Sequence, residues 1–332
     1  MGSSITNNSG ISLPLAVWLA VDPYTNGADR PEYQGRNLIS VTSLLKPVRQ
    51  TVLSSRLDPE DAPVDIMSRV KSRIGHAIHD SIEKAWTDDP KAREQALVAL
   101  GIPSKVAQKL AINPEVPADL SLYMEQRHFR EVDVDGFKVV VSGQFDMVLN
   151  GQNNDIKVTS TFTYTSGNKD EDYSLQGSCY RWLAPDIITS DTMMIQHIFT
   201  DWIASRARAT EEYPSSPVLD TPYELMPLDE TEAWIKSRIR EVIKNQNLPE
   251  QDVVRCTDKE LWRTQPSYKY YTDPDKAAQG RRASKVFSTS AAAHRHRAEK
   301  GKGTVLTIPG QVKACGYCPA FTLCSQKDMY EL

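Results

Sequence analysis

Apolar side chains recur every four residues between positions 64 and 86 of this 332-residue chain. They are Ile66, Val70, Ile74, Ile78 and Ile82. Because residues four apart lie on one side of an α-helix, this spacing predicts an amphipathic helix with its apolar stripe against a core. Pro63 precedes the stripe and suits the first turn of such a helix, where a backbone N–H is not needed.

A two-residue period replaces the helical one further along the chain. The β-type runs 129–134 and 137–141 flank Asp135 and Gly136, and an Asp-Gly pair between two such runs predicts a β-hairpin. The second run continues to Leu149, and a turn at 151–154 leads to a third run that starts at Asp155. These runs predict three consecutive strands.

The remaining pattern adds a helix at 170–184, an apolar strand at 193–200 and a helix at 229–245. Trp234, Ile235 and Ile239 fall on the buried side of the last helix, together with Val242 and Ile243. Between 91 and 120 the pattern suggests short helices interrupted by prolines. The order helix, three strands, helix, strand is typical of the α/β class.

Composition limits the function classes. The chain is 40% hydrophobic and 25% charged, and no apolar run approaches the roughly 20 residues that a membrane helix needs. No membrane association is therefore expected. The N-terminus lacks a basic region followed by an apolar core, which favours a cytoplasmic, reducing location.

Four regions follow from these patterns. We expect a flexible N-terminal segment over 1–30, a core with a helical insertion over 31–205, a linker and helix over 206–250, and a basic, cysteine-bearing module over 251–332. The net charge is −4, yet residues 263–313 contain eleven Lys or Arg and three Asp or Glu. A local basic surface is thus compatible with an acidic total.

A carboxylate and lysine cluster is the first candidate for chemistry. Asp155 and Lys157 are two apart on a predicted strand, so both point to one face of the sheet, and a short turn brings Asp146 beside them. Two carboxylates and an ammonium group are the set that metal-dependent phosphodiester hydrolysis requires. A solvated strand end with a simple ion pair is the alternative. The acid-x-Lys triplet also occurs by chance, as Asp89-Pro90-Lys91 shows.

Two flanking helices carry further polar pairs at helical spacing. His79 and Glu83 are four apart beside the apolar stripe of the first helix. Gln176 and Tyr180 have the same spacing in the second helix. Each pair alone is common on helix surfaces, and their joint order along the chain is what is informative.

In this order the motifs resemble the RecB-type exonuclease branch of the PD-(D/E)XK nuclease superfamily. That branch has a Gly-x-x-x-His helix, a Gly-x-x-Asp strand, an acid-x-Lys strand and a Gln-x-x-x-Tyr helix. The corresponding residues here are Gly75 to His79, Gly143 to Asp146, Asp155 to Lys157 and Gln176 to Tyr180. The resemblance covers residues 64–200 and implies a restriction-endonuclease-like core.

The resemblance also implies roles for these residues. Asp146 and Asp155 would bind Mg²⁺ or Mn²⁺, with the main chain near Ile156 and the imidazole of His79 as further ligands. Lys157 would orient the attacking water and offset charge on the phosphate. Gln176 and Tyr180 would hold the DNA strand or brace the site. Glu83 and Glu125 are outer carboxylates of lower rank.

Cysteines crowd the end of the chain. Cys315, Cys318 and Cys324 have spacings short enough for one loop to wrap three thiolates around a single centre, and Cys256 in the same tail is the natural fourth ligand. Cys179 falls in the Gln-x-x-x-Tyr helix, where a core role is expected. Four thiolates suit a 4Fe-4S cluster or a structural Zn²⁺.

This run resembles the Cys-x2-Cys-x5-Cys ending of AddB-type and CRISPR-associated adaptation nucleases, which favours 4Fe-4S. Those proteins have their first cysteine upstream of the nuclease core, near a segment that residues 39–46 resemble. No cysteine precedes Cys179 here. The resemblance therefore requires Cys256 to close the cluster.

Aromatic and basic residues alternate between Cys256 and Cys315, an arrangement that can stack bases and neutralise phosphates. The candidate DNA-binding residues are Tyr268, Lys269, Arg281, Arg282 and Lys285. A solvated charged face is the alternative.

Together these features predict a metal-dependent deoxyribonuclease, favoured as an exonuclease of recombination, replication or repair, similar to compact phage-encoded versions. Its expected partner is single-stranded DNA or duplex ends, and a recombination or replication protein partner stays open, as does the oligomeric state. The alternatives are a non-cleaving DNA-binding module derived from a nuclease fold and an RNA-directed or nucleotide-directed phosphodiesterase.

Overall fold

The computed structural model describes residues 5–21, 36–58, 64–116, 118 and 120–330. The chain divides into two compact units. Unit 1 contains Met1–Lys46 and Asp58–Glu241, and unit 2 contains Pro47–Leu57 and Val242–Leu332. Each unit is described by itself.

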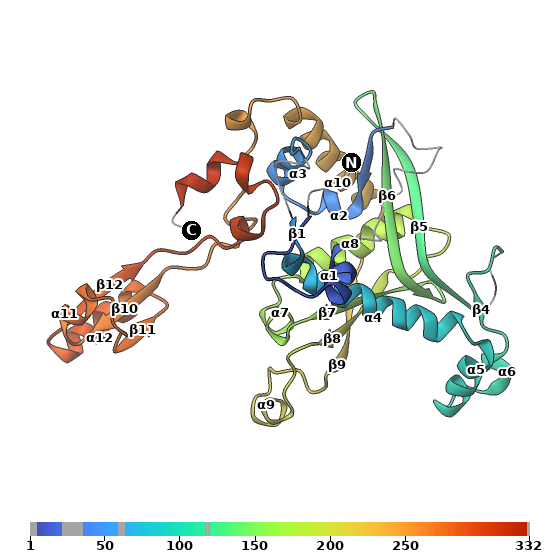
Figure 1. Cartoon of the computed structure of the whole chain (residues 1–332), viewed down its shortest axis with the longest axis horizontal. Coiled ribbons are helices and arrows are strands. Elements are labelled where there is room, and N and C mark those ends of the chain that lie inside the picture. The colour runs from blue at the N-terminus through green and yellow to red at the C-terminus, as the bar shows by residue number, and fades with distance from the viewer. Residues whose placement is uncertain (1–4, 22–35, 59–63, 117, 119, 331–332) are drawn as a thin grey trace. The chain divides into compact units, whose positions relative to one another are not determined.

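A mixed sheet forms the centre of unit 1, which is an α/β structure (Figure 1). Its order in the described residues is β4-β5-β6-β7-β8-β9, and β2 adds to β6. The strands are β2 Leu38–Ser40, β4 Ala111–Ile112, β5 Ser121–Val134, β6 Phe137–Leu149, β7 Gln152–Thr159, β8 Thr192–Phe199 and β9 Val218–Glu224. The β7–β8, β2–β6 and β4–β5 pairs are parallel, and the others are antiparallel.

The predicted hairpin is confirmed. Asp135 (φ 55°) and Gly136 (φ 88°) make the two-residue turn, and Val134 pairs with Phe137. The next turn differs from the prediction. It lies at Asn150 (φ 48°) and Gly151 (φ 84°), so β7 already starts at Gln152 rather than at Asp155. An Asn-Gly pair adopts these positive φ angles as readily as Asp-Gly, which is why the strand begins three residues early.

The first predicted helix is shorter than expected. Residues 64–69 form β3 Val64–Asp65 and a 3₁₀ turn, η2 Ile66–Arg69, because the Asp65 side chain accepts the N–H of Met67. Helix α4 spans Val70–Thr87. Ile74 is 40% exposed, so the apolar stripe is not buried along its whole length. Pro63 lies outside the described residues.

The segment 1–30, expected to be flexible, contains ordered elements where the structure describes it. β1 Ile5–Thr6 pairs with β3. Helix α1 Leu13–Ala20 buries Ala16 and Leu19 against Ile66. Further helices of unit 1 are α2 Val41–Leu44, α5 Pro90–Ala99, α6 Ser104–Ala107, α7 Thr161–Ser166, α8 Asp170–Leu183 and α9 Ala204–Ala209.

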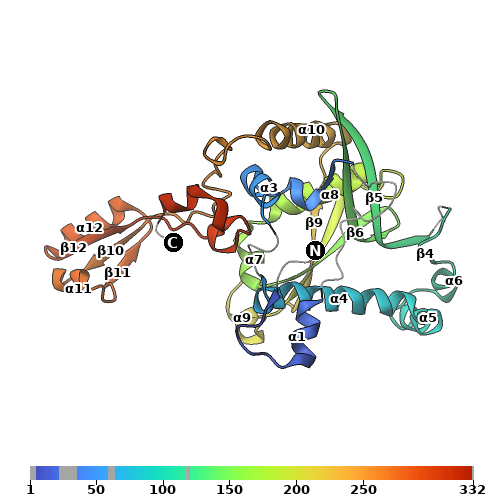
Figure 2. The same ribbon diagram turned by 45° about the horizontal axis from the view of Figure 1, so that its top comes forward.

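Helices α4 and α8 cover opposite faces of the sheet (Figure 2). Ile156 of β7 packs in a cluster with Ile82 and Trp86 of α4. On the opposite face of the sheet, Tyr173 of α8 packs on Met193 and Ile195 of β8. Asp155 is in register with Ile195 and therefore faces α8.

The predicted helices at 170–184 and 229–245 and the strand at 193–200 are confirmed as α8, α10 Leu228–Asn245 and β8. The region expected to be a linker after 205 differs, because β9 within it pairs with β8 along its whole length. The predicted core boundary at 205 thus cuts through the sheet.

Unit 2 has its own small sheet of order β11-β10-β12 in the described residues. Tyr270 in its central strand contacts His296 of the covering helix at 4.9 Å between ring centroids. The elements of unit 2 are α3 Val48–Ser54, η3 Glu250–Asp252, β10 Ser267–Tyr271, α11 Pro274–Ala278, β11 Lys285–Phe287, α12 Ser290–Lys300, β12 Thr304–Ile308, η4 Ala314–Tyr317, η5 Phe321–Leu323 and η6 Ser325–Met329.

None of the helices in the described part of the chain combines the length and apolar character that a membrane crossing needs.

Candidate functional site

The candidate site lies where β6 and β7 diverge. Their ladder pairs Leu149 with Gln152 and ends at Met147 and Asn154. Beyond this point the side chain of Asp146 takes the place of the neighbouring strand, and its Oδ2 accepts the backbone N–H of Ile156 at 2.8 Å. A gap with a carboxylate in it opens in the middle of the sheet.

Asp155 and Lys157 project from β7 into the same region, as the two-residue spacing predicts. Lys157 Nζ lies 2.5 Å from Asp155 Oδ2, and the Asp155 carboxylate is buried. Within the described residues, no hydrogen-bond donor is aligned on this Oδ2, whose compensating charge is the ammonium group.

The two helix residues expected at the site reach it from α8. Lys157 Nζ donates to Gln176 Oε1 at 3.1 Å, and Gln176 Nε2 donates to the Tyr180 hydroxyl at 2.8 Å. Tyr173 of the same helix lies 5.6 Å from the ammonium by its ring centroid. These contacts fix the Lys157 ammonium beside the carboxylates.

His79 approaches Asp146 from α4. Its Nδ1 lies 3.6 Å from Asp146 Oδ1 and 3.7 Å from Glu125 Oε1. His79, Glu125 and Asp146 bring one ligand atom each within 4.8 Å of one another. Glu83, four residues along α4, is half-buried, and its pKa is raised mainly by burial and then by repulsion from Glu125.

Glu125 is more central than the sequence suggested. It has φ 50° in the interior of β5, a conformation that non-glycine residues adopt at a cost of order 1–3 kcal/mol and that concentrates at functional sites. Gln144 Nε2 donates to Glu125 Oε2 at 2.7 Å, and Arg127 donates to Gln144 Oε1 at 2.9 Å. Glu125 is therefore held facing Asp146.

Glu125 was ranked low among the candidates, and the hairpin register could have ranked it higher. A two-residue turn at 135–136 pairs Gln126 with Phe145 and Met124 with Met147, which places residue 125 opposite Asp146. The sequence carries no signal for Gln144, because amide side chains have no distinctive spacing.

Charge repulsion and burial perturb the titration of the cluster. Burial, and then repulsion from Asp155, raises the pKa of Asp146 to about 7. Burial would lower the pKa of His79, but the carboxylates of Glu125 and Asp146 outweigh it and raise the pKa to about 9. Burial would also lower the pKa of Lys157, but the negative charges of Asp155 and Asp146 outweigh burial and raise this pKa.

This donor set fits a divalent cation. Carboxylate oxygens are the ligands that Mg²⁺ and Mn²⁺ prefer, and one imidazole suits Mn²⁺. Repulsion between the partly buried Asp146 and the buried Asp155 is the electrostatic situation that a bound cation relieves. Ile156 contributes its N–H to Asp146 in the structure.

The second acid-x-Lys triplet, Asp89-Pro90-Lys91, forms the start of a helix. Asp89 precedes α5 and its Oδ1 accepts the N–H groups of Lys91 and Ala92, each at 3.0 Å. Its residues are exposed, as expected of a helix start.

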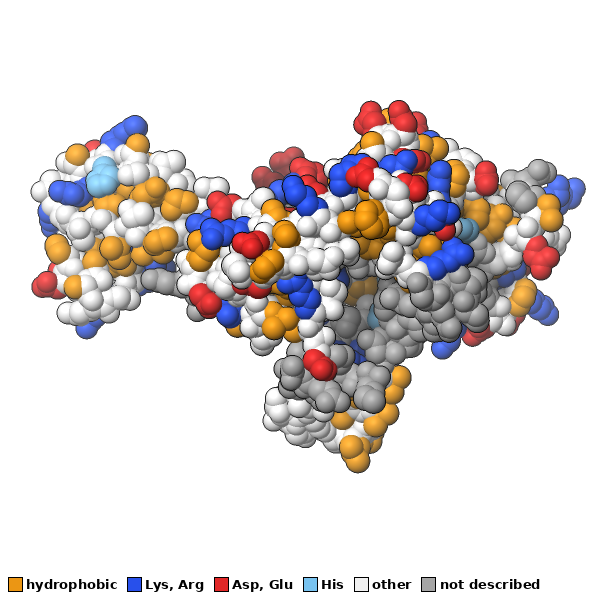
Figure 3. All heavy atoms as spheres, turned by 90° about the horizontal axis from the view of Figure 1, so that it is seen from above, with side chains coloured by type: hydrophobic (Ala, Val, Ile, Leu, Met, Phe, Trp, Pro, Cys, Tyr) orange, Lys and Arg blue, Asp and Glu red, His pale blue; other side chains and the backbone are white. Residues whose placement is uncertain are grey.

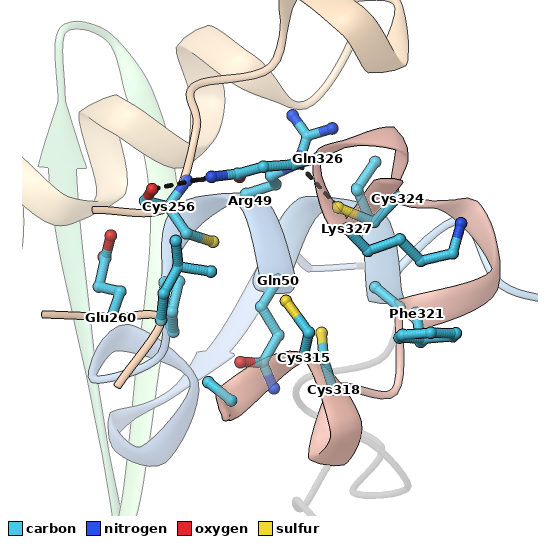
Figure 4. A pocket seen from close by; sticks show the side chains of 15 residues that line it. Arg49, Gln50, Cys256, Glu260, Cys315, Cys318, Phe321, Cys324, Gln326 and Lys327 are labelled. Atoms are coloured by element: carbon cyan, nitrogen blue, oxygen red, sulfur yellow. Dashed lines mark hydrogen bonds between the residues drawn. The ribbon is translucent and has the colours of Figure 1, made fainter. Parts of the chain in front are cut away.

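Four cysteines line one pocket of unit 2 (Figure 4). Cys315 points into it from η4 and Cys318 from the residue directly after η4, and Cys256 and Cys324 approach from either side. Among the described residues, no three of these thiol sulfurs lie within 4.8 Å of one another, as the ligand atoms of His79, Glu125 and Asp146 do. Burial raises the pKa of Cys256 to about 12 and raises those of Cys315 and Cys318. Cys179 is buried in α8, where a core role was expected.

The candidate DNA-binding residues lie on the small sheet of unit 2 and the loop beside it. Tyr268 and Lys269 are half-buried on β10, while Lys285, Arg281 and Arg282 are exposed. Apolar and basic side chains lie side by side on this lobe (Figure 3).

No protein-family model matches the chain, and no curated protein matches it. Among solved structures, one described as "Crystal structure of SSO0001" resembles it with a TM-score of 0.40 and 17% identity, over 65% of this chain and 80% of that chain. A superposition this loose assigns neither a family nor a function.

Proposed function

We propose that unit 1 is a metal-dependent nuclease that hydrolyses DNA phosphodiester bonds and acts as an exonuclease. The observation that carries this proposal is the group of His79, Glu125 and Asp146, whose ligand atoms lie within 4.8 Å of one another. It lies beside the Asp155–Lys157 ion pair of β7, because Asp146 accepts the N–H of Ile156 between them. The site would take Mg²⁺ or Mn²⁺, and the RecB-type resemblance of the four motifs supports the choice of reaction.

Each residue then has a distinct task. Asp146 and Asp155 would bind the cation, with His79 and Glu125 as neighbouring donors. When bound, the cation would polarise the phosphate and lower the pKa of water. The Lys157 ammonium would orient the attacking water and offset the negative charge that develops on the phosphate.

Gln176 supports Lys157 in this arrangement. Its Oε1 accepts from Nζ at 3.1 Å, and Tyr180 fixes the other end of the amide. Nζ thus contacts both Asp155 and Gln176, and the third N–H of the ammonium would serve the attacking water. Arg127, Gln144 and Tyr180 line a pocket of about 70 Å³. Gln144 connects the Arg127 guanidinium to Glu125, and this cation would contact a neighbouring phosphate.

For unit 2 we propose a metal centre held by Cys256, Cys315, Cys318 and Cys324. A 4Fe-4S cluster is favoured and Zn²⁺ is the alternative. The support is that all four thiols line one pocket although Cys256 lies far from the others in sequence. The basic residues 268–285 of the same unit would contact the DNA backbone.

The test is incubation of end-labelled single-stranded DNA, duplex DNA and RNA with Mn²⁺ or Mg²⁺. Wild type should release nucleotides from DNA, and Asp155→Ala and Lys157→Ala should lose at least about 100-fold in rate. Lys91→Ala, in the helix-cap triplet, is the matched control and should cut like wild type. Equal cutting by Lys157→Ala would refute the site.

The same assay separates the alternatives. Cleavage of RNA in preference to DNA would favour the RNA-directed phosphodiesterase. Binding of DNA without cleavage under either metal would favour the non-cleaving module.

A further inference from the structure

One buried cation borders the cysteine pocket of unit 2. Arg49 of α3 is 2% exposed, and its Nε donates to Cys324 Sγ at 3.1 Å (Figure 4). Its Nη1 donates to the carbonyl of Val253 at 2.8 Å, and its Nη2 pairs with the Glu250 carboxylate. The guanidinium is thus fixed in orientation, with one N–H directed at a sulfur.

The partners of Arg49 also hold the chain around Cys324. Glu250 accepts the backbone N–H of Ser325 at 2.9 Å and the Ser325 hydroxyl at 2.8 Å. The residue after Cys324 is therefore tied to the same carboxylate that pairs with Arg49. This arrangement leaves the direction of the Cys324 side chain little freedom.

A second buried polar side chain positions Cys256. Gln326 is 4% exposed, its Oε1 accepts the N–H of Cys256 at 2.8 Å, and its Nε2 donates to the Cys256 carbonyl at 2.9 Å. Gln326 lies two residues after Cys324. Its amide holds the backbone of Cys256, the one cysteine of the four that is distant in sequence. Both ends of the four-cysteine set are thus fixed by buried polar groups.

A charged donor directed at sulfur is informative because sulfur in a thiol is a weak acceptor. Burying a guanidinium is costly unless its neighbours carry compensating charge. Glu250 supplies one negative charge, and a thiolate bound to metal would supply a second at Nε. The geometry fits a metal-bound sulfur better than a free thiol.

We propose that Arg49 is a positioning residue of the metal centre, donating a hydrogen bond to the metal-bound Cys324 sulfur and making α3 a structural part of that centre. This inference rests on the proposed cysteine-bound centre of unit 2 and is independent of the nuclease site. Hydrogen bonds to ligand sulfurs raise the reduction potential of iron–sulfur clusters and slow metal loss.

The experiment uses the full chain, purified anaerobically, with iron, zinc and sulfide measured. Arg49→Met and Arg49→Lys are compared with Arg56→Met. Arg56 lies in the same segment and donates to the carbonyls of Gln246 at 3.1 Å and Leu248 at 2.8 Å without touching a cysteine in the structure. It is the matched control for loss of an arginine that ties the segment to the rest of unit 2.

We expect Arg49→Met to lose its metal to a chelator about tenfold faster than wild type, the size of effect seen for groups that support metal ligands. With an iron–sulfur cluster, its reduction potential should also fall. Arg56→Met should match wild type in both. If Arg49→Met does not fold, Arg49→Lys decides, because it keeps the charge and loses the directed Nε.

Three results would overturn the proposal. Purified wild-type protein that contains neither iron nor zinc would show that the proposed metal centre does not exist. Metal-loaded wild type with unchanged release and potential in the Arg49 variants would leave the centre and reject Arg49. Equal acceleration in Arg56→Met would assign the effect to general loosening of the segment.

Discussion

Replacing Asp146 by Asn should stabilise the metal-free protein while removing its response to metal. The pKa of Asp146 is raised from 3.8 to about 7 by burial and by Asp155. Each tenfold change in proton affinity is about 1.4 kcal/mol, so ionised Asp146 costs the folded state ~4 kcal/mol. Because the side chain remains 17% exposed, solvent screens part of this, and we expect a gain of about 2 kcal/mol.

The pH dependence has a definite sign. The folded pKa exceeds that of the unfolded chain, so the unfolded state binds fewer protons between pH 4 and 7. The wild-type protein therefore loses stability as pH rises through this range, whereas Asn has no such dependence. The advantage of Asp146→Asn should be fully present at pH 8 and should shrink toward pH 4.

Thermal unfolding in EDTA measures the effect. A gain of ~2 kcal/mol in a unit of this size corresponds to about 5 °C in Tm at pH 8. Mn²⁺ at 100 times its Kd should stabilise wild type by about 2.7 kcal/mol and should stabilise the variant much less.

Asp155→Asn is the matched comparison and should behave oppositely without metal. Asp155 lies 2.5 Å from the Lys157 ammonium, so its neutralisation leaves a largely buried charge without its near partner and should destabilise by about 2 kcal/mol or more. If Asp146→Asn lowers Tm in EDTA at pH 8, or if both variants retain the full Mn²⁺ response, our account of the electrostatics is wrong.

Further substitutions test the surroundings. Glu125→Gln should weaken Mn²⁺ binding about tenfold in calorimetry, and unchanged affinity would exclude Glu125 from the centre. Gly143→Ala should destabilise by about 1–3 kcal/mol, because a Cβ there would meet two side chains of α8 at 2.7 and 2.9 Å; Gly75→Ala, with nothing within 4 Å, should stabilise α4 by up to ~1 kcal/mol. Both should be measured by denaturant unfolding. Charge reversal at Arg281 and Arg282 should weaken DNA binding and lower its salt dependence by about two ions, and a salt titration identical to wild type would reject this surface.

Local patterns in the sequence predicted much of unit 1. The Asp135-Gly136 turn determined the β5–β6 register, and the two-residue spacing of Asp155 and Lys157 placed both on one face. These features depend on neighbours in the chain, which is why they could be predicted. The start of α4 was wrong by several residues, because the Asp65 side chain stabilises a 3₁₀ turn there.

The long-range features could not be predicted. The positive φ of Glu125 and its hydrogen bond from Gln144 have no local signal, and β9 joins the sheet through pairing with β8. The approach of Arg49 to Cys324 joins positions 275 residues apart and has no local signature. Such contacts are set by tertiary packing rather than by periodicity.

The proposed nuclease site requires that Asp146, Asp155 and His79 hold a divalent cation beside Lys157. Anomalous diffraction from crystals grown with Mn²⁺ tests it most directly. We expect a manganese peak within bonding distance of Asp146 and Asp155, with an imidazole nitrogen of His79 among the ligands. A crystal that shows no peak at these carboxylates in saturating Mn²⁺ would contradict it.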